Sequence, residues 1–360
     1  MRKSILVLMA MGACLGMQGQ NQYAGYSAYM QAVDEYHPAP GQFVNDMPYY
    51  DAGDDAASMA EKCTQAIAGD VYASGHSMIS LGGFGGYVTF HFDHRVSNEP
   101  GQRDFSILGN TFATKQTDGS LLTLSSEPGI VMVSVDENGN GLPDDTWYEL
   151  AGSCTDALYN YEVTYYPNPL GDISWSDNQG GEGFIARLDE YHDQEYFPLW
   201  LDGPQTYRGT LLPKNGTKVS DSPEKWELTA FDWGYVDNQP NLGLDSDYDW
   251  QGNGFDIGWA VDADRQPVHL AGIDFIRVYT AENQQCGWIG DTSTEVSGAK
   301  DLHLEASIMA TGIEGITAER QSVATQYYDL SGRRLSSPQH GLNIVRMADG
   351  SIRKEMRNSK

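Results

Sequence analysis

The sequence predicts an all-β protein whose strands pair antiparallel, with a small β module at the C-terminal end. Short runs that alternate β-branched or aromatic residues with polar ones recur along the chain, and clusters of Gly, Pro, Asn and Asp separate them. Long helical periodicity is absent from the sequence, and the runs lack the spacing of βαβ units. These observations favour an antiparallel β-sandwich or barrel. The 40 glycines among 360 residues agree with this, because tight turns use glycine.

The chain is expected to divide into four parts. Residues 1–20 form a signal peptide, 21–75 an N-terminal extension, 76–305 the β-sandwich domain, and 306–360 a linker with the C-terminal module. Helical spacing and good helix formers over residues 56–68 predict one short helix in the extension. Strand-type residues predict the strands of the sandwich at residues 87–93, 104–108, 129–135, 146–150, 161–166, 226–231, 255–261 and 273–280.

The first residues have the pattern of a secretory signal. A basic start at residues 1–3 precedes an apolar run over residues 4–13, which is too short to span a bilayer. The small residues before Cys14 resemble a bacterial lipobox. Two alternatives therefore stay open, lipidation at Cys14 or ordinary cleavage near Gly19. Both predict export, to the cell surface and outer membrane or to the extracellular space.

The C-terminal segment differs from the rest of the chain in charge and in pattern. Residues 313–360 hold 8 basic and 5 acidic residues, whereas the whole chain has a net charge of −28. Runs at residues 328–334, 341–346 and 350–354 alternate with Gly turns, which predicts a small β module. The pattern resembles the C-terminal sorting domain of type IX secretion substrates of Bacteroidetes, although Asn343 stands where that family often has Tyr. The alternative is a terminal β-hairpin without a sorting role.

The strong negative charge excludes several classes of partner. The chain has 22 Lys and Arg against 50 Asp and Glu, whereas nucleic-acid backbones require clustered basic residues. Peripheral binding to anionic lipids is disfavoured for the same reason. No run of 18 uncharged apolar residues follows the signal, so no transmembrane segment is expected. Cys63, Cys154 and Cys286 allow at most one internal disulfide, and there is no CxxC pair.

Three stretches of the sandwich domain resemble a group of exported bacterial proteins. They are SLGGFGGYVTF at residues 80–90, GIVMVSVDENGNGLPDDTWYELAGS at 129–153, and the run over 255–280, in which Arg265 and Gln266 stand where a turn Gly is typical. The pattern is similar to the cell-surface jelly-roll proteins of Bacteroidetes. That resemblance implies a sandwich similar to galactose-binding modules, on the cell surface. Some members of the group are associated with nutrient acquisition, including corrinoid uptake.

The loop over residues 136–145 is the clearest candidate for a metal site. Side-chain oxygens at positions 1, 3 and 5, a Gly at position 6 and a main-chain carbonyl at position 7 are typical of a calcium loop. Further acidic residues would close the shell, so the predicted ligands are Asp136, Asn138, Asn140, Leu142, Asp144 and Asp145. Position 12 is Trp147 rather than the Glu of an EF-hand, so we expect an EF-like loop within a β-hairpin. The expected role of the calcium ion is structural, because it would neutralise the local acidic charge and hold the loop in place. The alternative is a solvated Asn/Gly turn. A second acidic loop, residues 245–249, has a weaker pattern because Trp250 occupies position 6.

Aromatic residues in loop-like stretches indicate a ligand site. A flat ring stacks on the C–H face of a sugar, while neighbouring Asp and Asn side chains bind its hydroxyls. The predicted ligand-binding residues are Trp175, Trp233, Asp237, Asn238, Trp250 and Asp256, in loops at one end of the sandwich. The alternative is that these rings fill the core under long loops.

The leading functional hypothesis is an exported, cell-surface protein that binds a carbohydrate or glycan. HExxH, GxSxG, P-loop and Rossmann patterns are all absent from the sequence, so no catalytic residue is predicted. Three alternatives stay open: a glycan-active hydrolase or lyase, a surface accessory for nutrient uptake that includes corrinoids, and an adhesin. The expected partners are a small-molecule or glycan ligand and the outer-membrane machinery for uptake or secretion.

Overall fold

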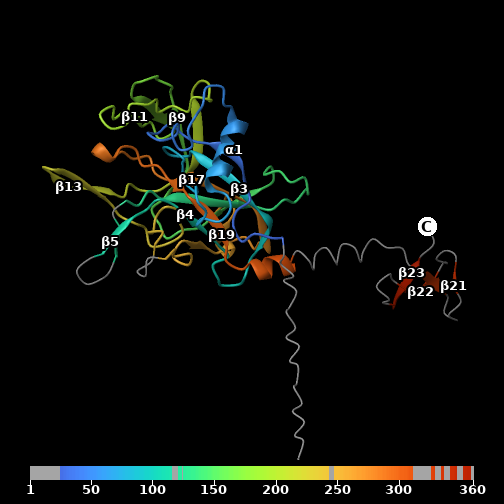
Figure 1. Cartoon of the computed structure of the whole chain (residues 1–360). Helices are drawn as coiled ribbons and strands as arrows, with labels where there is room; N and C mark the ends of the chain where they lie inside the picture. The colour runs from blue at the N-terminus through green and yellow to red at the C-terminus, as the bar shows by residue number, and fades with distance from the viewer. Residues whose placement is uncertain are drawn as a thin grey trace, which may run out of the picture.

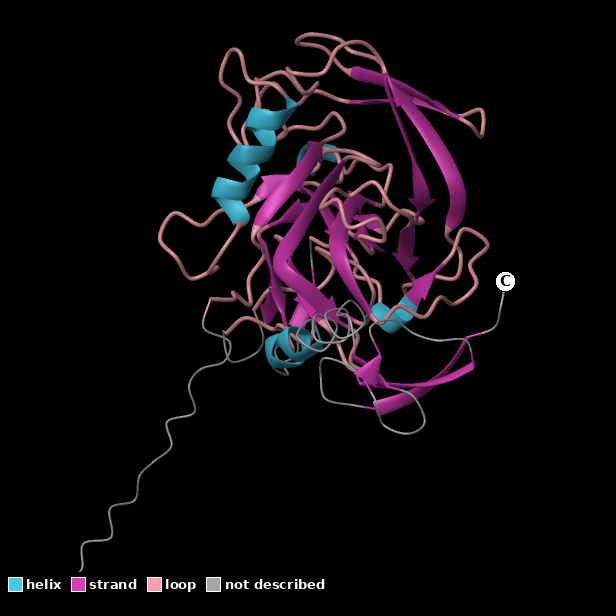
Figure 2. Cartoon of the chain, turned by 90° about the vertical axis from the view of Figure 1, so that its right-hand side faces the viewer, coloured by secondary structure: helices cyan, strands magenta, loops and turns pink. Residues whose placement is uncertain are grey.

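The computed structural model describes residues 25–115, 121–123, 125–242 and 247–310, and four short strands between residues 326 and 357. Strands dominate this part of the chain, and they pair antiparallel in several sheets (Figures 1 and 2). The fold is therefore all-β, as the alternating sequence pattern predicted. The predicted signal peptide and Cys14 lie outside the described residues.

A six-stranded sheet forms the centre of the molecule. Its strands, in spatial order, are β1 (Ala32–His37), β3 (Tyr87–Ser97), β17 (Gly272–Thr280), β7 (Gly129–Ser134), β8 (Trp147–Leu150) and β16 (Ala260–Val261). The N-terminal extension is therefore part of the sandwich rather than an addition to it, because β1 pairs with β3.

The register of this sheet sorts its side chains into two faces. Phe90, Ile276 and Val133 align across β3, β17 and β7 and face one side. The next position along each strand points to the other side. There Glu35, Thr89, Arg277, Met132 and Glu149 align in one row across five strands, so that row is mostly polar. We call these the core face and the outer face.

The core face is covered by smaller sheets. One has the order β15 (Gly254–Phe255), β4 (Phe105–Leu108) and β19 (Gly298–Asp301), and the other joins β18 (Glu295–Val296) to β2 (Ile79–Ser80). Phe105, Ile107, Phe255 and Val296 pack with the apolar residues of the core face in one buried cluster. These layers form the sandwich, and β4 and β19 lie below β17 in Figure 1.

A four-stranded sheet lies on the opposite side and covers part of the outer face. Its order is β11 (Glu182–Ile185), β10 (Ile173–Asp177), β9 (Leu158–Tyr165) and β12 (Gln205–Leu211). Tyr161, Val163 and Tyr207 of this sheet pack with Ile130 and Tyr279 of the central sheet in a second buried cluster. In Figure 1, β9 and β11 lie above β17. The central sheet is thus covered on both sides, where the sequence had suggested two layers.

The remaining elements are short. Hairpins join β13 (Gly216–Asp221) to β14 (Glu224–Leu228) and β5 (Ala113–Lys115) to β6 (Leu121–Thr123). The predicted helix is α1 (Ala56–Ile67), capped by Asp55, which accepts a hydrogen bond from the Ser58 N–H at 2.9 Å. Two 3-10 turns, η1 (Ile257–Trp259) and η2 (Gly287–Ile289), and a helical segment at residues 304–310 complete the body. No helix among the described residues is long and apolar enough to cross a membrane.

The C-terminal module is a four-stranded antiparallel sheet. Its order is β21 (Arg334–Leu335), β20 (Gln326–Tyr328), β22 (Gly341–Arg346) and β23 (Ile352–Arg357). The glycine-separated runs therefore form strands, as predicted.

Candidate functional site

Two adjoining pockets lie between the outer face of the central sheet and the four-stranded sheet. Their volumes are about 210 Å³ and 270 Å³, and both are lined by Met132, Arg208 and Tyr279. We call them together the sheet cleft. Its walls carry five aromatic and four cationic or imidazole side chains, namely Tyr87, Trp147, Tyr159, Tyr207 and Tyr279, and His37, Arg208, Arg265 and Arg277.

The guanidinium group of Arg277 lines the cleft and is held in a fixed orientation. Its guanidinium carbon lies 4.4 Å from the ring centre of Tyr87 and 4.4 Å from that of Trp147. Its Nε donates to the Thr89 hydroxyl at 2.9 Å, and its Nη2 to the Glu35 carboxylate at 2.5 Å. A guanidinium has five N–H donors, so these bonds fix the plane and leave donors for a ligand.

The carboxylate of Glu149, in the same row of the outer face, is also held in a fixed orientation by its neighbours. Its carboxylate accepts from the Thr210 hydroxyl at 2.7 Å and from the Tyr279 hydroxyl at 3.3 Å, and it pairs with Arg265 at 2.5 Å. Burial, and then the charge of Glu149, hold the pKa of Tyr279 well above its usual range. Tyr279 therefore stays a hydrogen-bond donor, and Glu149 is an oriented acceptor.

Arg265 reaches this position from a strained turn. Its φ is 62°, in the left-handed region that favours Gly, where another residue costs roughly 1–2 kcal/mol. Its guanidinium lies 4.6 Å from the ring centre of Tyr159 and pairs with Glu149. The Arg265 side chain therefore completes one wall of the cleft.

The close approach of the two sheets sets the shape of the cleft. A Cβ on Gly209 of β12 would come within 2.7 Å of the Tyr279 ring, so only Gly fits there. At the other end His37 lies 5.6 Å from Tyr87 and 5.5 Å from Tyr207, ring centre to ring centre. Burial lowers the pKa of His37, so at neutral pH it offers one donor and one acceptor rather than a charge.

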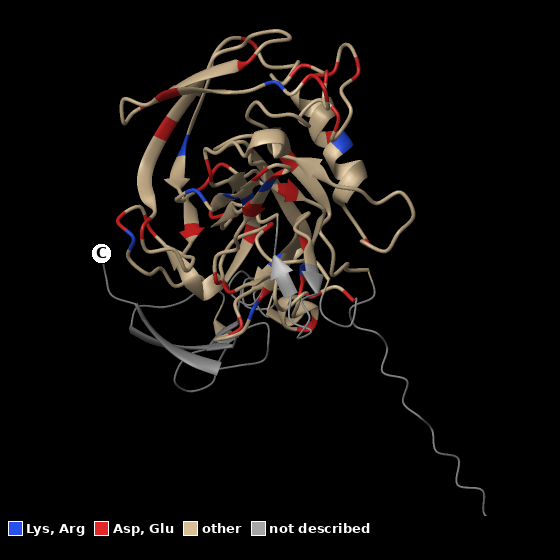
Figure 3. Cartoon of the chain, turned by 90° about the vertical axis from the view of Figure 1, so that its left-hand side faces the viewer, with Lys and Arg blue, Asp and Glu red and all other residues tan. Residues whose placement is uncertain are grey.

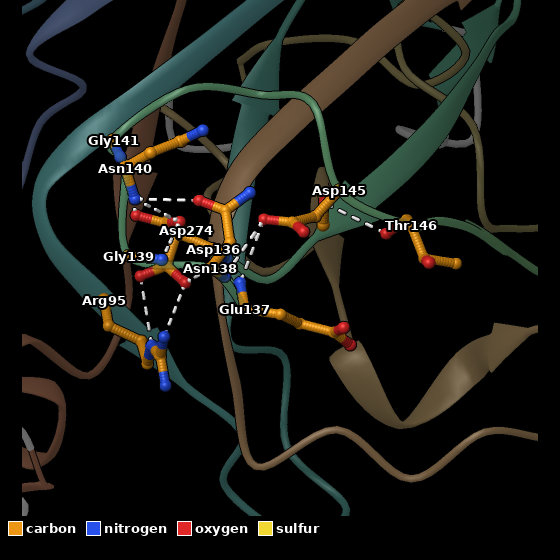
Figure 4. A network of polar contacts seen from close by, with 11 residues as sticks. Arg95, Asp136, Glu137, Asn138, Gly139, Asn140, Gly141, Asp145, Thr146 and Asp274 are labelled. Atoms are coloured by element: carbon orange, nitrogen blue, oxygen red, sulfur yellow. Dashed lines mark hydrogen bonds and ion pairs between the residues drawn. The ribbon is translucent and has the colours of Figure 1, made fainter.

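The predicted calcium loop joins β7 to β8, and its side chains converge (Figure 4). The Asp136 carboxylate accepts main-chain N–H groups of Gly139, Asn140 and Gly141 at 2.8, 3.1 and 2.9 Å. The Asn138 amide nitrogen donates to Asp144 Oδ1 at 3.0 Å. The Asn140 amide nitrogen lies 3.2 Å from Oδ1 and 3.0 Å from Oδ2 of Asp144.

The side-chain oxygens of Asn138 and Asn140 accept the main-chain N–H groups of Asn140 and Leu142 at 3.0 and 2.7 Å. An Asn amide presents an oxygen where its nitrogen lies once the group turns over, so the same side chains can offer oxygens to an ion beside Asp144. Asp145 Oδ2 likewise accepts a main-chain N–H, that of Glu137, at 3.0 Å. The Asp136 N–H donates to Asp274, which also pairs with Arg95 of β3, so the loop is tied to the sheet.

The aromatic residues predicted to bind a ligand do not line the sheet cleft. Trp175 lies on β10 and packs against the second buried cluster, and Trp233 is 39 % exposed and contacts Trp259 at 4.6 Å between ring centres. Trp250 lies near Tyr29 and Lys300. Within the described residues, no ring contact joins any two of these three side chains. Asp256 borders a different pocket, described below.

Asp237 and Asn238 were expected on an exposed ligand surface, and this expectation is wrong, because each is 1 % exposed. Asp237 accepts main-chain N–H groups of Asn110 at 2.5 Å, Thr111 at 2.6 Å and Glu295 at 3.0 Å. Asn238 bonds to both main-chain groups of Phe231. The turn-type residues that suggested a recognition loop instead clamp loops together.

Asp237 also belongs to a buried carboxylate cluster that the sequence did not reveal. Oxygens of Glu127, Asp237 and Glu295 lie within 4.8 Å of one another, and no ion pair in the described part of the chain involves them. Burial raises the pKa of Asp237 to about 6, and burial with mutual repulsion raises those of Glu127 and Glu295 well above the usual range. The cluster therefore retains protons near neutral pH. The residues are too far apart in sequence for a spacing rule to find them.

Elsewhere the acidic residues are spread over strands and loops (Figure 3). The weaker acidic loop is only partly visible, because Asp245 lies outside the described residues. Asp249 accepts the Gly252 N–H at 2.8 Å. Cys63, Cys154 and Cys286 are all free thiols, so the structure contains no disulfide among them.

A scan against protein-family models and a search of curated proteins both find no match to this chain.

Proposed function

We propose that this protein binds a neutral carbohydrate in the sheet cleft. The observation that carries the proposal is the row of Thr89, Arg277 and Glu149, interrupted only by Met132, on a sheet face that also presents Tyr87 and Trp147. This site lies on the face of the sheet rather than in the loops at one end.

The chemistry of the cleft favours hydroxyl groups over an ion. Arg265, Arg277 and Arg208 pair with Glu149, Glu35 and Glu162 respectively, so the three cationic charges are offset. A sugar hydroxyl both donates and accepts, and it can therefore bond an arginine N–H and a carboxylate oxygen at once. Ring edges and faces of the aromatic walls supply the apolar contact that a pyranose needs.

Calcium is the second part of the proposal. The loop of residues 136–145 leads directly into β8, which carries Trp147 and Glu149. An ion bound by Asp136, Asn138, Asn140 and Asp144 would fix the start of β8. Its role is to position the cleft wall, not to react.

Export to the cell surface stays a proposal that rests on residues 1–13 and on the glycine-separated strands of the C-terminal module. A glycan ligand suits that location.

The test is a screen of neutral oligosaccharides followed by calorimetric titration of the best binder with Trp147→Ala and Arg277→Met. We expect each variant to weaken the affinity at least tenfold, which is about 1.4 kcal/mol. Trp288→Ala is the matched control, because Trp288 is 51 % exposed and does not line the cleft. Chromatography of the incubated sugars shows whether product is released.

Unchanged affinity in both cleft variants would rule out the cleft as the site. Loss of affinity in the control as well would point to a general loss of folding, which thermal melting of each variant detects. Release of a product would mean that the protein is a hydrolase or lyase rather than a binding protein.

A further inference from the structure

A separate pocket of about 460 Å³ lies at one end of the three-stranded sheet. The residues that matter for its chemistry are Gln102, Arg103, Gln251, Asp256, Trp259 and His303. It shares no lining residue with the sheet cleft. Its volume falls in the range of small-molecule sites, about 300–1,000 Å³.

The register of the sheet explains why these residues meet. Phe105 of β4 pairs with Phe255 of β15 and with Asp301 of β19. Arg103 precedes β4, Asp256 follows β15, and His303 follows β19. Because all three strands pair antiparallel around β4, these flanking residues gather at the same end.

Two nitrogen atoms in this pocket lack a hydrogen-bond partner among the residues that the structure describes. Arg103 Nη1 and His303 Nε2 are both buried, and neither makes a hydrogen bond with any described residue. Leaving a buried donor unpaired costs about 1–3 kcal/mol, and more for a charged group. The Arg103 guanidinium carbon lies 4.1 Å from the ring centre of Trp259, which fixes the plane in which Nη1 points. These are the features of a group arranged to meet an acceptor from outside the chain.

Asp256 borders the same pocket, and its negative charge acts on Arg103 without a direct contact between the two groups. Asp256 Oδ1 accepts the Gly258 N–H at 2.7 Å, and Asp256 forms no ion pair with Arg103 within the described residues. A ligand that meets both groups needs an anionic oxygen at one end and hydrogen-bond donors at the other. A dianion such as sulfate or phosphate would be repelled by Asp256.

We propose that this pocket binds the carboxylate of an acidic sugar, of the uronic acid class. The carboxylate accepts from Arg103 Nη1 and His303 Nε2, and the ring hydroxyls donate to Asp256 and bond to the amides of Gln102 and Gln251. This site is independent of the neutral-sugar proposal for the sheet cleft.

The test is a titration of the full chain with galacturonate and glucuronate, followed by ligand-detected NMR, with galactose and sulfate as comparison probes. We expect a uronate to bind, Arg103→Met to weaken it at least tenfold, and His303→Ala to weaken it less. Lys225→Gln removes one positive charge at an exposed site in the β13–β14 hairpin and should leave the affinity unchanged. Trp147→Ala should also leave it unchanged, which separates this site from the sheet cleft.

Thermal melting of the same variants supplies a second readout. Because Nη1 makes no hydrogen bond with any described residue, Arg103→Met should keep the midpoint of the protein without ligand within about 2 °C of the wild type. A large loss of stability would mean that Arg103 serves the fold. The proposal fails if no uronate binds at 10 mM, a test concentration on the order of the weakest useful affinities. It also fails if sulfate binds with the same Arg103 dependence, or if Arg103→Met and His303→Ala leave uronate affinity unchanged.

Discussion

The two faces of the central sheet use the same strands for opposite purposes. On the core face, Phe90, Ile276 and Val133 form an apolar row that other sheets cover completely. One residue away, Thr89, Arg277 and Met132 form a row that the four-stranded sheet covers only in part. The core face holds the fold together, and the outer face holds polar groups in fixed positions. We therefore expect the ligand to bind on the outer face, where the side chains are ordered but remain accessible.

The difference between the two faces is tested most strongly by truncating one side chain on each face and comparing the loss of stability. Phe90→Ala removes a fully buried ring and should lower the free energy of unfolding by about 3–5 kcal/mol. Trp147→Ala removes a half-buried ring at the cleft and should cost less than half of that. Urea unfolding of both variants measures the difference. Equal losses would mean that the outer face is also core.

The second largest expected effect is the stabilisation by calcium. The loop of residues 136–145, which leads to the outer face, has a cation-binding pattern, and the core face has no such loop in the described residues. Calcium at 100 times its dissociation constant should stabilise the fold by about 2.7 kcal/mol. Thermal melting with calcium and with chelator measures this, and Asp136→Asn should abolish the difference. Asp249→Asn, in the weaker acidic loop, is the control and should respond to calcium like the wild type. A midpoint that chelator leaves unmoved would contradict the calcium site.

The carboxylate cluster is the exception to the comparison, because Asp237 and Glu295 adjoin Val236 and Val296 of the apolar core. Burial raises the pKa of Asp237 to about 6, and the pKa values of Asp104 and Asp291 to about 6 as well. A carboxyl group whose folded pKa is raised stabilises the fold at low pH, and that contribution is lost as the pH rises through the folded value.

Stability should therefore fall between about pH 4 and pH 7, by about 1.4 kcal/mol for each unit of pKa shift. Glu127→Gln keeps an acceptor for the Ser293 N–H and removes one charge, so it should flatten this fall. Melting midpoints from pH 4 to pH 8 for both proteins test it. A wild-type midpoint that rises with pH over this range would refute the assignment.

The strands were predictable where the alternation is strong, as at residues 87–93 and 273–280. The expected strand at 255–261 is instead broken by η1, because the Asp256 side chain accepts the Gly258 N–H and starts a turn. β1 went unpredicted because its sequence, AVDEYH, places two acidic residues together.

The candidate sites differ in the same way. All predicted calcium ligands lie within ten residues, so spacing alone could propose them. The sheet cleft depends on register, which pairs Arg277 with Thr89 and with Met132 from distant strands. A lone arginine between Ile276 and Val278 was the one local signal of it. The positions of Trp175, Trp233 and Trp250 in the sequence did not indicate whether their side chains would share one site.

The most direct test is to map where a bound neutral oligosaccharide protects the backbone from hydrogen–deuterium exchange. The proposed binding mode predicts protection in β8, β12 and β17, with little change at Trp233 or Trp250. Protection confined to those tryptophan loops, or an exchange pattern that the sugar leaves unchanged at saturation, would contradict it.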